Sequence, residues 1–365
     1  MPVRVMTILG TRPEIIRLSL VIKKLDALSE HILVHTGQNY NYYLNDIFFE
    51  QMEIRKPDLM ITGKTHSFGQ QLGSLMPRLE ELIKEQQPER VLVLGDTNTA
   101  LAATVIASRL GVPIFHMEAG NRCFDRSVPE ELNRKMIDSI ADLNLPYTSG
   151  SRENLLREGI DTNRISVSGN PIYEVLLHYA DQIQRSDIHK RLQIENRNYM
   201  LMTAHRAENV DNPERLRNIF KAATMIAEST DMPVICSIHP RTKARLQEYG
   251  VRFNSNRIQT HTPFGFYDFI ALEKHASLVL TDSGTVQEEC CLFHVPAVTM
   301  RRTTERPETI ACGSNTLGSV ETESIVLAAN LANSKSVNWK CPEGYEDTDV
   351  SSRVVNIVLG GQMYV

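Results

Sequence analysis

Three carboxylic acids stand where short apolar segments of the chain end. Asp96 closes RVLVLGD, Glu118 closes VPIFHME, and Glu130 follows soon after in VPEELNRK. Carboxylates that share one site push their pKa values apart, which suits them to act as general acid and general base. The pattern therefore indicates proton transfer. The competing interpretation is structural: Asp96 or Thr97 caps a helix, and Glu130 and Glu131 only begin one.

A second set of residues has the character of an anion-binding site. Arg12 lies in GTRPE, Ser283 and Gly284 lie in LTDSG, and Arg306 lies in the basic run MRRTTERPET. Backbone N–H groups at the start of a helix and an arginine guanidinium both suit phosphate. His205 of TAHRAEN also follows an apolar segment. The plainer alternatives are a tight turn with a solvated arginine, a packed histidine and a solvated basic loop.

The elements that must position these residues alternate in type along both halves of the chain. In the first half we predict strands at 3–9, 31–36, 90–96 and 112–118, with helices at 13–28, 74–87 and 99–110. In the second half we predict strands at 199–205, 232–239, 257–261, 276–284 and 295–300, with helices at 214–229, 265–275 and 285–293. Short apolar strands separated by helices indicate parallel sheets covered on both faces.

This alternation predicts an α/β protein with two Rossmann-like, doubly wound domains, which 365 residues readily fill. We expect an N-terminal domain over 1–170, a C-terminal domain over 171–350 and a last helix within 351–365. Ligands of such sheets bind beyond the carboxyl ends of the strands. The polar residues are therefore expected to face a cleft between the domains. They indicate an enzyme acting on a nucleotide-linked compound, and they do not separate a glycosyltransferase from an isomerase.

Composition and charge exclude several classes of function. The chain has 44 acidic and 39 basic residues, a formal charge of −5, which argues against a nucleic-acid partner. It has no apolar run long enough for a membrane helix, and MPVRVMTILG lacks the features of a signal peptide, so we expect a cytoplasmic protein. The six cysteines show no zinc-site spacing and are expected to be reduced thiols, with no metal bound.

Six motifs in order give the chain a specific resemblance. GTRPE, GDT, EAG–R, PEE–NR, DSG–QEE and TTERPE together resemble the non-hydrolysing UDP-N-acetylglucosamine 2-epimerases. The resemblance implies a glycosyltransferase-B-like pair of domains, a last helix that packs back on the first domain, and a homodimer. It implies no nicotinamide and no catalytic metal. The implied reaction inverts C2 of a UDP-N-acetylhexosamine: UDP leaves, a 2-acetamidoglucal forms, and UDP adds back.

The resemblance also assigns roles to individual positions. Asp96, Glu118 and Glu130 match the catalytic carboxylates, and His205 matches the active-site histidine. Arg17 stands where the family more often has lysine and is assigned to the substrate-binding set. The other substrate-binding positions implied are Arg12, Arg306, Ser283 and Gly284 for the diphosphate, Glu289 for the ribose, Phe269 near the uracil, and Arg134 on the sugar side.

Departures from the common family pattern bear on the sugar. The loop NRCFDRSVPEE is shorter than usual and lacks a tryptophan-containing stretch, and Thr285 replaces a usual glycine. GTRPEIIRLS, HTGQNYNYYLNDIFF and MEAGNRCFD look closer to the subgroup that makes UDP-N-acetyl-L-fucosamine. We therefore expect a product of the UDP-ManNAc or UDP-L-FucNAc type, for surface polysaccharide.

Two other functions remain as alternatives to an epimerase. One is a glycosyltransferase of the same fold with a UDP-sugar donor. The other is a regulator that binds a nucleotide sugar without turning it over. Some members of the resembled family carry a second UDP-N-acetylglucosamine site, for which Gln38, Gln70 and His239 are the candidate residues here.

Overall fold

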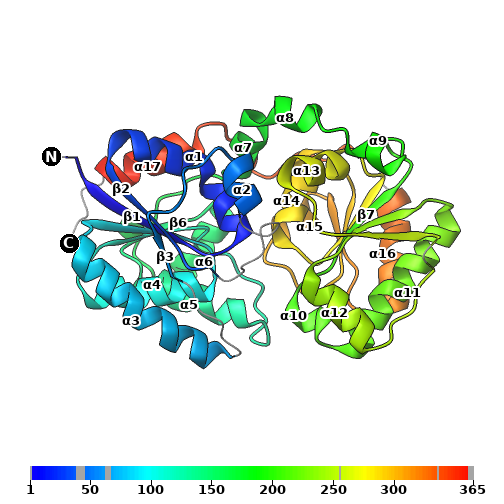
Figure 1. The fold of residues 1–365 in the computed structure, drawn as a ribbon, viewed down its shortest axis with the longest axis horizontal. Coiled ribbons are helices and arrows are strands. Elements are labelled where there is room, and N and C mark those ends of the chain that lie inside the picture. The colour runs from blue at the N-terminus through cyan, green and yellow to red at the C-terminus, as the bar shows by residue number, and fades with distance from the viewer. Residues whose placement is uncertain (1, 38–45, 62–66, 255, 335–336, 361–365) are drawn as a thin grey trace. The chain divides into compact units, whose positions relative to one another are not determined.

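The structure is a computed structural model that describes residues 2–37, 46–61, 67–254, 256–334 and 337–360 (Figure 1). It divides into two compact units: unit 1 comprises residues 1–177 and 343–365, and unit 2 comprises residues 178–342. The sequence prediction placed the divisions at 170/171 and 350/351 instead. Gln38 and the other residues of HTGQNYNYYLNDIFF between 38 and 45 lie outside the described residues.

Unit 1 is built on a parallel sheet of six strands in the order β3-β2-β1-β4-β5-β6. The strands are β1 (Arg4–Leu9), β2 (Glu30–His35), β3 (Leu59–Met60), β4 (Arg90–Leu94), β5 (Ile114–Met117) and β6 (Leu143–Leu145). The helices are α1 (Arg12–Leu28), α2 (Asp46–Gln51), α3 (Phe68–Gln86), α4 (Asn98–Arg109), α5 (Pro129–Ile140), α6 (Ser149–Arg157), α7 (Ile172–His178) and α17 (Val350–Gly360), with a 3-10 turn at Thr162–Arg164.

Helices cover both faces of this first sheet, α1 and α17 on one and α3, α4 and α5 on the other (Figure 1). Alternate residues of the central strands, such as Met6 and Ile8, pack with buried residues of α3 and α4. The C-terminal helix α17 lies against α1, where the Lys24 ammonium contacts the Ser352 hydroxyl. The backbone N–H of Ser351 donates to Glu174 at 2.7 Å. The last helix therefore belongs to unit 1.

Unit 2 repeats the same topology with the strand order β12-β11-β10-β7-β8-β9, also parallel throughout. Its strands are β7 (Met200–Thr203), β8 (Val234–Ser237), β9 (Ile258–His261), β10 (Leu278–Thr281), β11 (Ala297–Thr299) and β12 (Asn315–Leu317). Its helices are α8 (Ala180–Gln184), α9 (Ile188–Leu192), α10 (Ala207–Val210), α11 (Pro213–Thr230), α12 (Pro240–Glu248), α13 (Phe266–Lys274), α14 (Gly284–Leu292), α15 (Pro307–Ala311) and α16 (Thr322–Ser334). Each unit is thus a Rossmann-like domain, as predicted.

The order of strands reverses once in each sheet. In unit 1 the reversal lies between β1 and β4, and in unit 2 it lies between β7 and β10. The loops after two such strands diverge to opposite faces of the sheet and leave a crevice, which is where open α/β sheets bind ligands. No helix in the described part of the chain combines the length and the apolar character needed to cross a bilayer.

Candidate functional site

Asp96 and Glu118 lie just beyond the carboxyl ends of two neighbouring strands, β4 and β5. Leu94 of β4 pairs with Met117 of β5, so Glu118 stands one residue and Asp96 two residues beyond a matched pair. Both side chains are partly buried, with 22% of Asp96 and 14% of Glu118 exposed. Glu130 lies in the first turn of α5 and is also partly buried. The strand pairing thus brings the first two predicted carboxylates to neighbouring strand ends.

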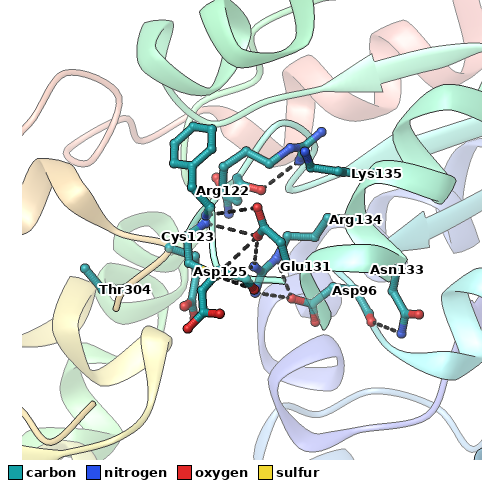
Figure 2. A network of polar contacts seen from close by, with 12 residues as sticks. Asp96, Arg122, Cys123, Asp125, Glu131, Asn133, Arg134, Lys135 and Thr304 are labelled. Atoms are coloured by element: carbon teal, nitrogen blue, oxygen red, sulfur yellow. Dashed lines mark hydrogen bonds and ion pairs between the residues drawn. The ribbon is translucent and has the colours of Figure 1, made fainter. Parts of the chain in front are cut away.

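Arg134 joins Asp96 to the acidic start of α5 (Figure 2). Its Nε and Nη2 lie 2.8 and 2.7 Å from Asp96 Oδ2, and its Nη1 donates to Glu131 Oε2 at 2.8 Å. Thr97, not Asp96, caps α4, because the Thr97 hydroxyl accepts from the backbone N–H of Ala100 at 3.1 Å. The helix-capping interpretation therefore holds for Thr97. The Asp96 carboxylate instead binds the guanidinium of Arg134.

Glu131 organises the loop that precedes α5, a role that the sequence analysis did not assign. Its two carboxylate oxygens accept the backbone N–H groups of Cys123 and Phe124, both at 3.0 Å (Figure 2). Phe124 has a left-handed backbone, with φ of 56°, which a side chain rarely adopts without such support. Burial and the nearby Glu131 carboxylate raise the pKa of the Cys123 thiol. Glu131 is thus the structural member of the PEE pair.

Arg17 pairs with Glu118 inside unit 1. Arg17 is only 1% exposed, and its Nη1 donates to Glu118 Oε2 at 3.0 Å. Its guanidinium lies over the ring of Tyr147, 5.6 Å from the ring centroid. Glu118 itself has φ of 67°, so the backbone turns sharply directly after β5. Arg17 thus holds the Glu118 carboxylate in place directly after β5.

A buried ionic network supports the loop that follows Glu118. Asp138 of α5 lies 2.8 Å from His116 Nδ1 and 2.7 Å from Arg122 Nη2, and it accepts the backbone N–H of Gly120 at 3.1 Å. His116 Nε2 lies 2.8 Å from the carbonyl oxygen of Gly95, so both ring nitrogens face acceptors. Gly120 has φ of 77°, and a Cβ there would lie 2.2 Å from the Ser151 carbonyl oxygen. Only glycine fits this turn.

Glu14 bridges the two loops that flank the reversal of strand order in unit 1. Its Oε2 accepts from the backbone N–H groups of Gly10 and Thr11, at 3.0 and 2.7 Å, and from the Thr11 hydroxyl. Its Oε1 accepts from the Thr97 hydroxyl at 3.2 Å. Burial raises the pKa of Glu14 to about 7 although these donors oppose the shift. Glu14 belongs to the segment GTRPE, and no role was predicted for it from the sequence.

Replacing Glu14 by Gln is expected to make unit 1 more stable at pH 8 and to leave it nearly unchanged at pH 5. The folded pKa of about 7 lies above the reference value of 4.5, so the wild-type protein loses stability as pH rises through this interval. The loss is roughly 3 kcal/mol at most, at about 1.4 kcal/mol per pKa unit. Glutamine keeps the acceptor for Gly10 and Thr11 and presents an amide donor to Thr97. Urea unfolding of both proteins at pH 5, 6.5 and 8 measures the difference.

The difference between the two proteins isolates Glu14, because every other titrating group is common to both. Parallel stability curves for the wild-type protein and Glu14→Gln across this range would contradict the raised pKa of Glu14. Glu14→Ala serves as the comparison that also removes the acceptor, and it is expected to be less stable than Glu14→Gln at every pH.

Asp282 takes the bridging position in unit 2. It is fully buried and accepts the backbone N–H groups of His205 and Arg206 at 3.1 and 3.0 Å, and the Asn209 amide at 3.2 Å. His205 Nδ1 lies 3.4 Å from Asp282 Oδ1, and the His205 side chain is 32% exposed. His205 is therefore a partly open histidine held by a carboxylate, not a packed core residue. Asp282 belongs to the segment LTDSG, and no role was predicted for it from the sequence.

The predicted phosphate turn begins α14. Ser283 is the residue before the helix, and its hydroxyl contacts the Thr285 hydroxyl at 2.9 Å and does not cap a backbone N–H. A Cβ on Gly284 would lie 2.5 Å from Glu305 Oε1, so a larger residue displaces that carboxylate. The N–H groups at the start of α14 have the arrangement that binds anions at helix N-termini.

Arg306 and Arg301 are buried, so the solvated-loop alternative is wrong for both. Arg306 is 2% exposed and pairs through Nε with Glu288, which α14 carries. Arg301 is 3% exposed and donates to Glu305 at 2.8 Å. Arg302 alone of the three arginines in this run is exposed. In this structure Arg306 is held by a carboxylate beside the start of α15.

Glu289 and Phe269 lie on the helices that flank β10. Glu289 is buried in α14, and Phe269 is partly buried in α13. Burial and the neighbouring Glu289 raise the pKa of Glu273, a fully buried residue of α13. Cys290 Sγ lies 3.2 Å from Glu273 Oε1. Glu289 is thus part of a buried carboxyl pair that no pattern in the sequence predicts.

The two described candidate residues for a second nucleotide-sugar site each lie at the start of a helix. Gln70 lies in the first turn of α3, in unit 1. His239 caps α12 in unit 2, where its Nδ1 accepts the backbone N–H of Arg241 at 3.2 Å. Among the residues described, no group of three or more His, Cys, Asp or Glu side chains is arranged to hold a metal ion.

Arg12 begins α1 with its guanidinium over the Phe48 ring, 5.5 Å from the centroid. It is partly exposed, so the interpretation of a fully solvated arginine is too simple. The six predicted residues of unit 1 therefore come from the loops after β4 and β5 and from α1 and α5. Those of unit 2 come from the loops after β7, β10 and β11 and from α13 and α14.

Comparison with known proteins gives one consistent family. A family model described as UDP-N-acetylglucosamine 2-epimerase matches residues 23–359. UDP-N-acetylglucosamine 2-epimerase from Methanocaldococcus jannaschii is 40% identical, over 97% of this chain and 98% of that protein. UDP-2,3-diacetamido-2,3-dideoxy-D-glucuronate 2-epimerase from Pseudomonas aeruginosa is 38% identical, over 92% and 93%. The crystal structure of the M. jannaschii enzyme with UDP-GlcNAc and UDP superposes with a TM-score of 0.93 at 39% identity, covering 98% of this chain and 99% of that one.

Proposed function

Because this chain belongs to the UDP-N-acetylglucosamine 2-epimerase family and is an isomerase, we propose that it inverts C2 of a UDP-N-acetylhexosamine by eliminating UDP and adding it back. The C2 proton is not beside a carbonyl, so simple deprotonation is very difficult. Departure of UDP from C1 lets the proton leave and forms a 2-acetamidoglucal. Protonation of C2 on the other face and return of UDP complete the inversion.

Unit 1 supplies the acid and base groups in this proposal. The observation that carries it is the pair Asp96 and Glu118, which follow matched positions of neighbouring strands and each face a buried arginine. Proton transfer on both faces of C2 needs two such groups, and Glu130 at the start of α5 provides a third.

Unit 2 holds UDP in this proposal. Ser283, Gly284 and the first N–H groups of α14 suit the diphosphate, and His205, oriented by Asp282, suits the charge that develops as UDP leaves. Glu289 is assigned to the ribose and Phe269 to the uracil side. Arg12 and Arg306 add positive charge for the diphosphate. Arg306 must then share its guanidinium between UDP and Glu288.

The identity of the sugar is the open part of the proposal. Relatives of similar identity include enzymes named for UDP-N-acetylglucosamine and for a diacetamido-dideoxyglucuronate, so the family accepts different hexosamines. We propose a product of the UDP-ManNAc or UDP-L-FucNAc type for surface polysaccharide. A homodimer and a cytoplasmic location remain predictions from the sequence.

A panel of UDP-N-acetylhexosamines incubated with the protein in deuterated water tests reaction and sugar together. At least one substrate is expected to yield a C2 epimer that carries deuterium at C2, because the proton removed exchanges before another is delivered. Epimerisation without label at C2, or no exchange with any member of the panel, would contradict the proposal. A glycosyltransferase of this fold would instead consume a UDP-sugar only when an acceptor is present, and it would leave C2 unlabelled.

A further inference from the structure

Two thiols of unit 2 lie in contact at the C-terminal ends of α14 and α15. Cys291 is in the last turn of α14, and Cys312 directly follows α15. Their Sγ atoms are 3.7 Å apart, although 21 positions separate the two residues in the chain. Cys291 is fully buried, whereas Cys312 is partly exposed. The fold therefore presents one accessible sulfur with a second sulfur directly behind it.

The two thiols differ in their readiness to ionise. The hydrogen bond with Cys291 and the hydroxyl of Ser314, 3.3 Å away, lower the pKa of Cys312 to about 6 in spite of partial burial. The same contact with Cys312, together with burial, raises the pKa of Cys291. The partly exposed sulfur is thus the more readily ionised of the two. Thiolates are the nucleophiles of thiol–disulfide exchange.

We propose that Cys312 and Cys291 form a reactive dithiol that small-molecule disulfides oxidise to an intramolecular disulfide. The Cys312 thiolate attacks one sulfur of the small disulfide, forms a mixed disulfide and releases one small thiolate. The released thiolate takes the proton of Cys291, whose sulfur attacks Cys312 Sγ and expels the second small thiolate, which water protonates. Two protein thiols become one disulfide, and one small disulfide becomes two small thiols.

The geometry requires little movement for the second step. The sulfurs need only close from 3.7 Å to about 2.05 Å, the length of a disulfide bond. The new bond joins the end of α14, which starts at Gly284, to the end of α15, which starts directly after Arg306. Oxidation therefore fixes, relative to each other, two helices that carry proposed diphosphate residues.

Neighbouring cysteines provide matched controls for this pair. Cys341 Sγ lies 3.6 Å from the carbonyl oxygen of Cys291, so it is close to the pair and is itself buried. Cys290 adjoins Cys291 in the chain but its sulfur contacts Glu273, and burial together with that carboxylate raises its pKa well above the usual value. Neither presents an accessible thiolate.

The test uses the reduced full-length chain and oxidised glutathione at pH 7.5. After trapping with N-ethylmaleimide and digestion, mass spectrometry is expected to show a peptide pair linked through Cys291 and Cys312 as the main oxidised product. Cys291→Ser is expected to stop at a glutathione adduct on Cys312, Cys312→Ser to form neither species, and Cys341→Ser to behave as wild type. Linkage of Cys291 to Cys341, or a Cys312 that stays unmodified, would overturn the proposal.

A measurement on the wild-type protein keeps the proposal testable if a serine variant fails to fold. Iodoacetamide is expected to alkylate Cys312 at least tenfold faster than Cys291 at pH 7, with a rate for Cys312 that falls below about pH 6. Equal rates for the two cysteines, or faster labelling of Cys291, would show that the accessible thiolate does not exist.

Discussion

Replacing Asp96 by Asn is expected to lower kcat about 1,000-fold, within the range that general acid–base groups contribute. The asparagine side chain keeps the size of the aspartate and one acceptor for Arg134, whose Nε and Nη2 both contact Asp96 Oδ2 in the wild-type protein. What is lost is the negative charge and the ability to take or give a proton. Turnover is measured by the C2 epimer formed, and proton transfer by deuterium uptake at C2.

Asp142→Asn is the matched control for this substitution. Asp142 directly precedes β6, so it lies at the amino ends of the strands, whereas Asp96 lies at their carboxyl ends. The Asp142 carboxylate accepts the backbone N–H of Ile114 at 2.8 Å, and an asparagine oxygen can accept the same hydrogen bond. We expect Asp142→Asn to retain nearly wild-type kcat. If Asp96→Asn turned over at more than a tenth of the wild-type rate while its fold and KM were unchanged, Asp96 would not be an acid–base residue.

The prediction from the sequence was most accurate for the helices and strands whose position is set by the pattern of hydrophobic residues. The helix expected at 13–28 spans Arg12–Leu28, and the strand expected at 90–96 spans Arg90–Leu94. These segments are long and apolar enough that their burial decides their structure. β3, β6 and β12 were not predicted, because strands of two or three residues carry no period of their own. β11 is equally short but was predicted, because it lies within the longer apolar run VPAVTM. They exist because a neighbouring strand offers hydrogen-bonding groups at the sheet edge.

Some of the polar site residues could also be predicted from the sequence, whereas their partners could not. Strand ends could be located from the sequence, and with them Asp96, Glu118 and His205. The partners of these residues could not be, because they come from segments far along the chain: Asp282 reaches the backbone N–H of His205 from 77 positions away. A single sequence contains no signal for such a contact until the register of the sheet is known.

The two units share one structural feature, a carboxylate that bridges two loops. In each, a buried carboxylate spans the two loops at the reversal of strand order, Glu14 in unit 1 and Asp282 in unit 2. Backbone N–H groups at such loop ends would otherwise need another acceptor. Because each carboxylate binds backbone N–H groups of the loops, it fixes the loops and leaves the neighbouring site side chains to make other contacts. The loops after β1, β4, β7 and β10 thus hold Arg12, Asp96, His205 and Ser283 on rigid supports.

Replacing Asp138 by Ala is expected to lower the free energy of unfolding by about 3–5 kcal/mol, the usual result when one partner of a buried ion pair is removed. Asp138 is 1% exposed and is the carboxylate that faces His116 and Arg122. Alanine leaves the buried Arg122 guanidinium with less compensation, removes the carboxylate that faces His116 and frees the Gly120 N–H. Urea unfolding at pH 7, followed by far-UV circular dichroism, measures the loss.

Lys135→Met tests the exposed end of the same network. Glu158 contacts the buried Arg122 guanidinium at 2.6 Å and Lys135 at 3.1 Å. Lys135 is 44% exposed, so water screens its pair with Glu158. We expect a change below about 1 kcal/mol for this variant. A loss of similar size for Lys135→Met and Asp138→Ala would mean that burial does not control the strength of the network.

The dependence on pH identifies the charge of Asp138 as the cause of the loss. Burial alone would raise the pKa of Asp138, but the hydrogen bonds and charges of His116 and Arg122 outweigh it and hold the pKa below the usual 3.8. Such a group stabilises the fold at every pH above its unfolded pKa, and the contribution disappears as pH falls through the lower folded value. The gap between wild type and Asp138→Ala should therefore shrink as the pH falls below about 4. Because the same network holds the turn directly after Glu118, Asp138→Ala is also expected to lower kcat, and Lys135→Met is not.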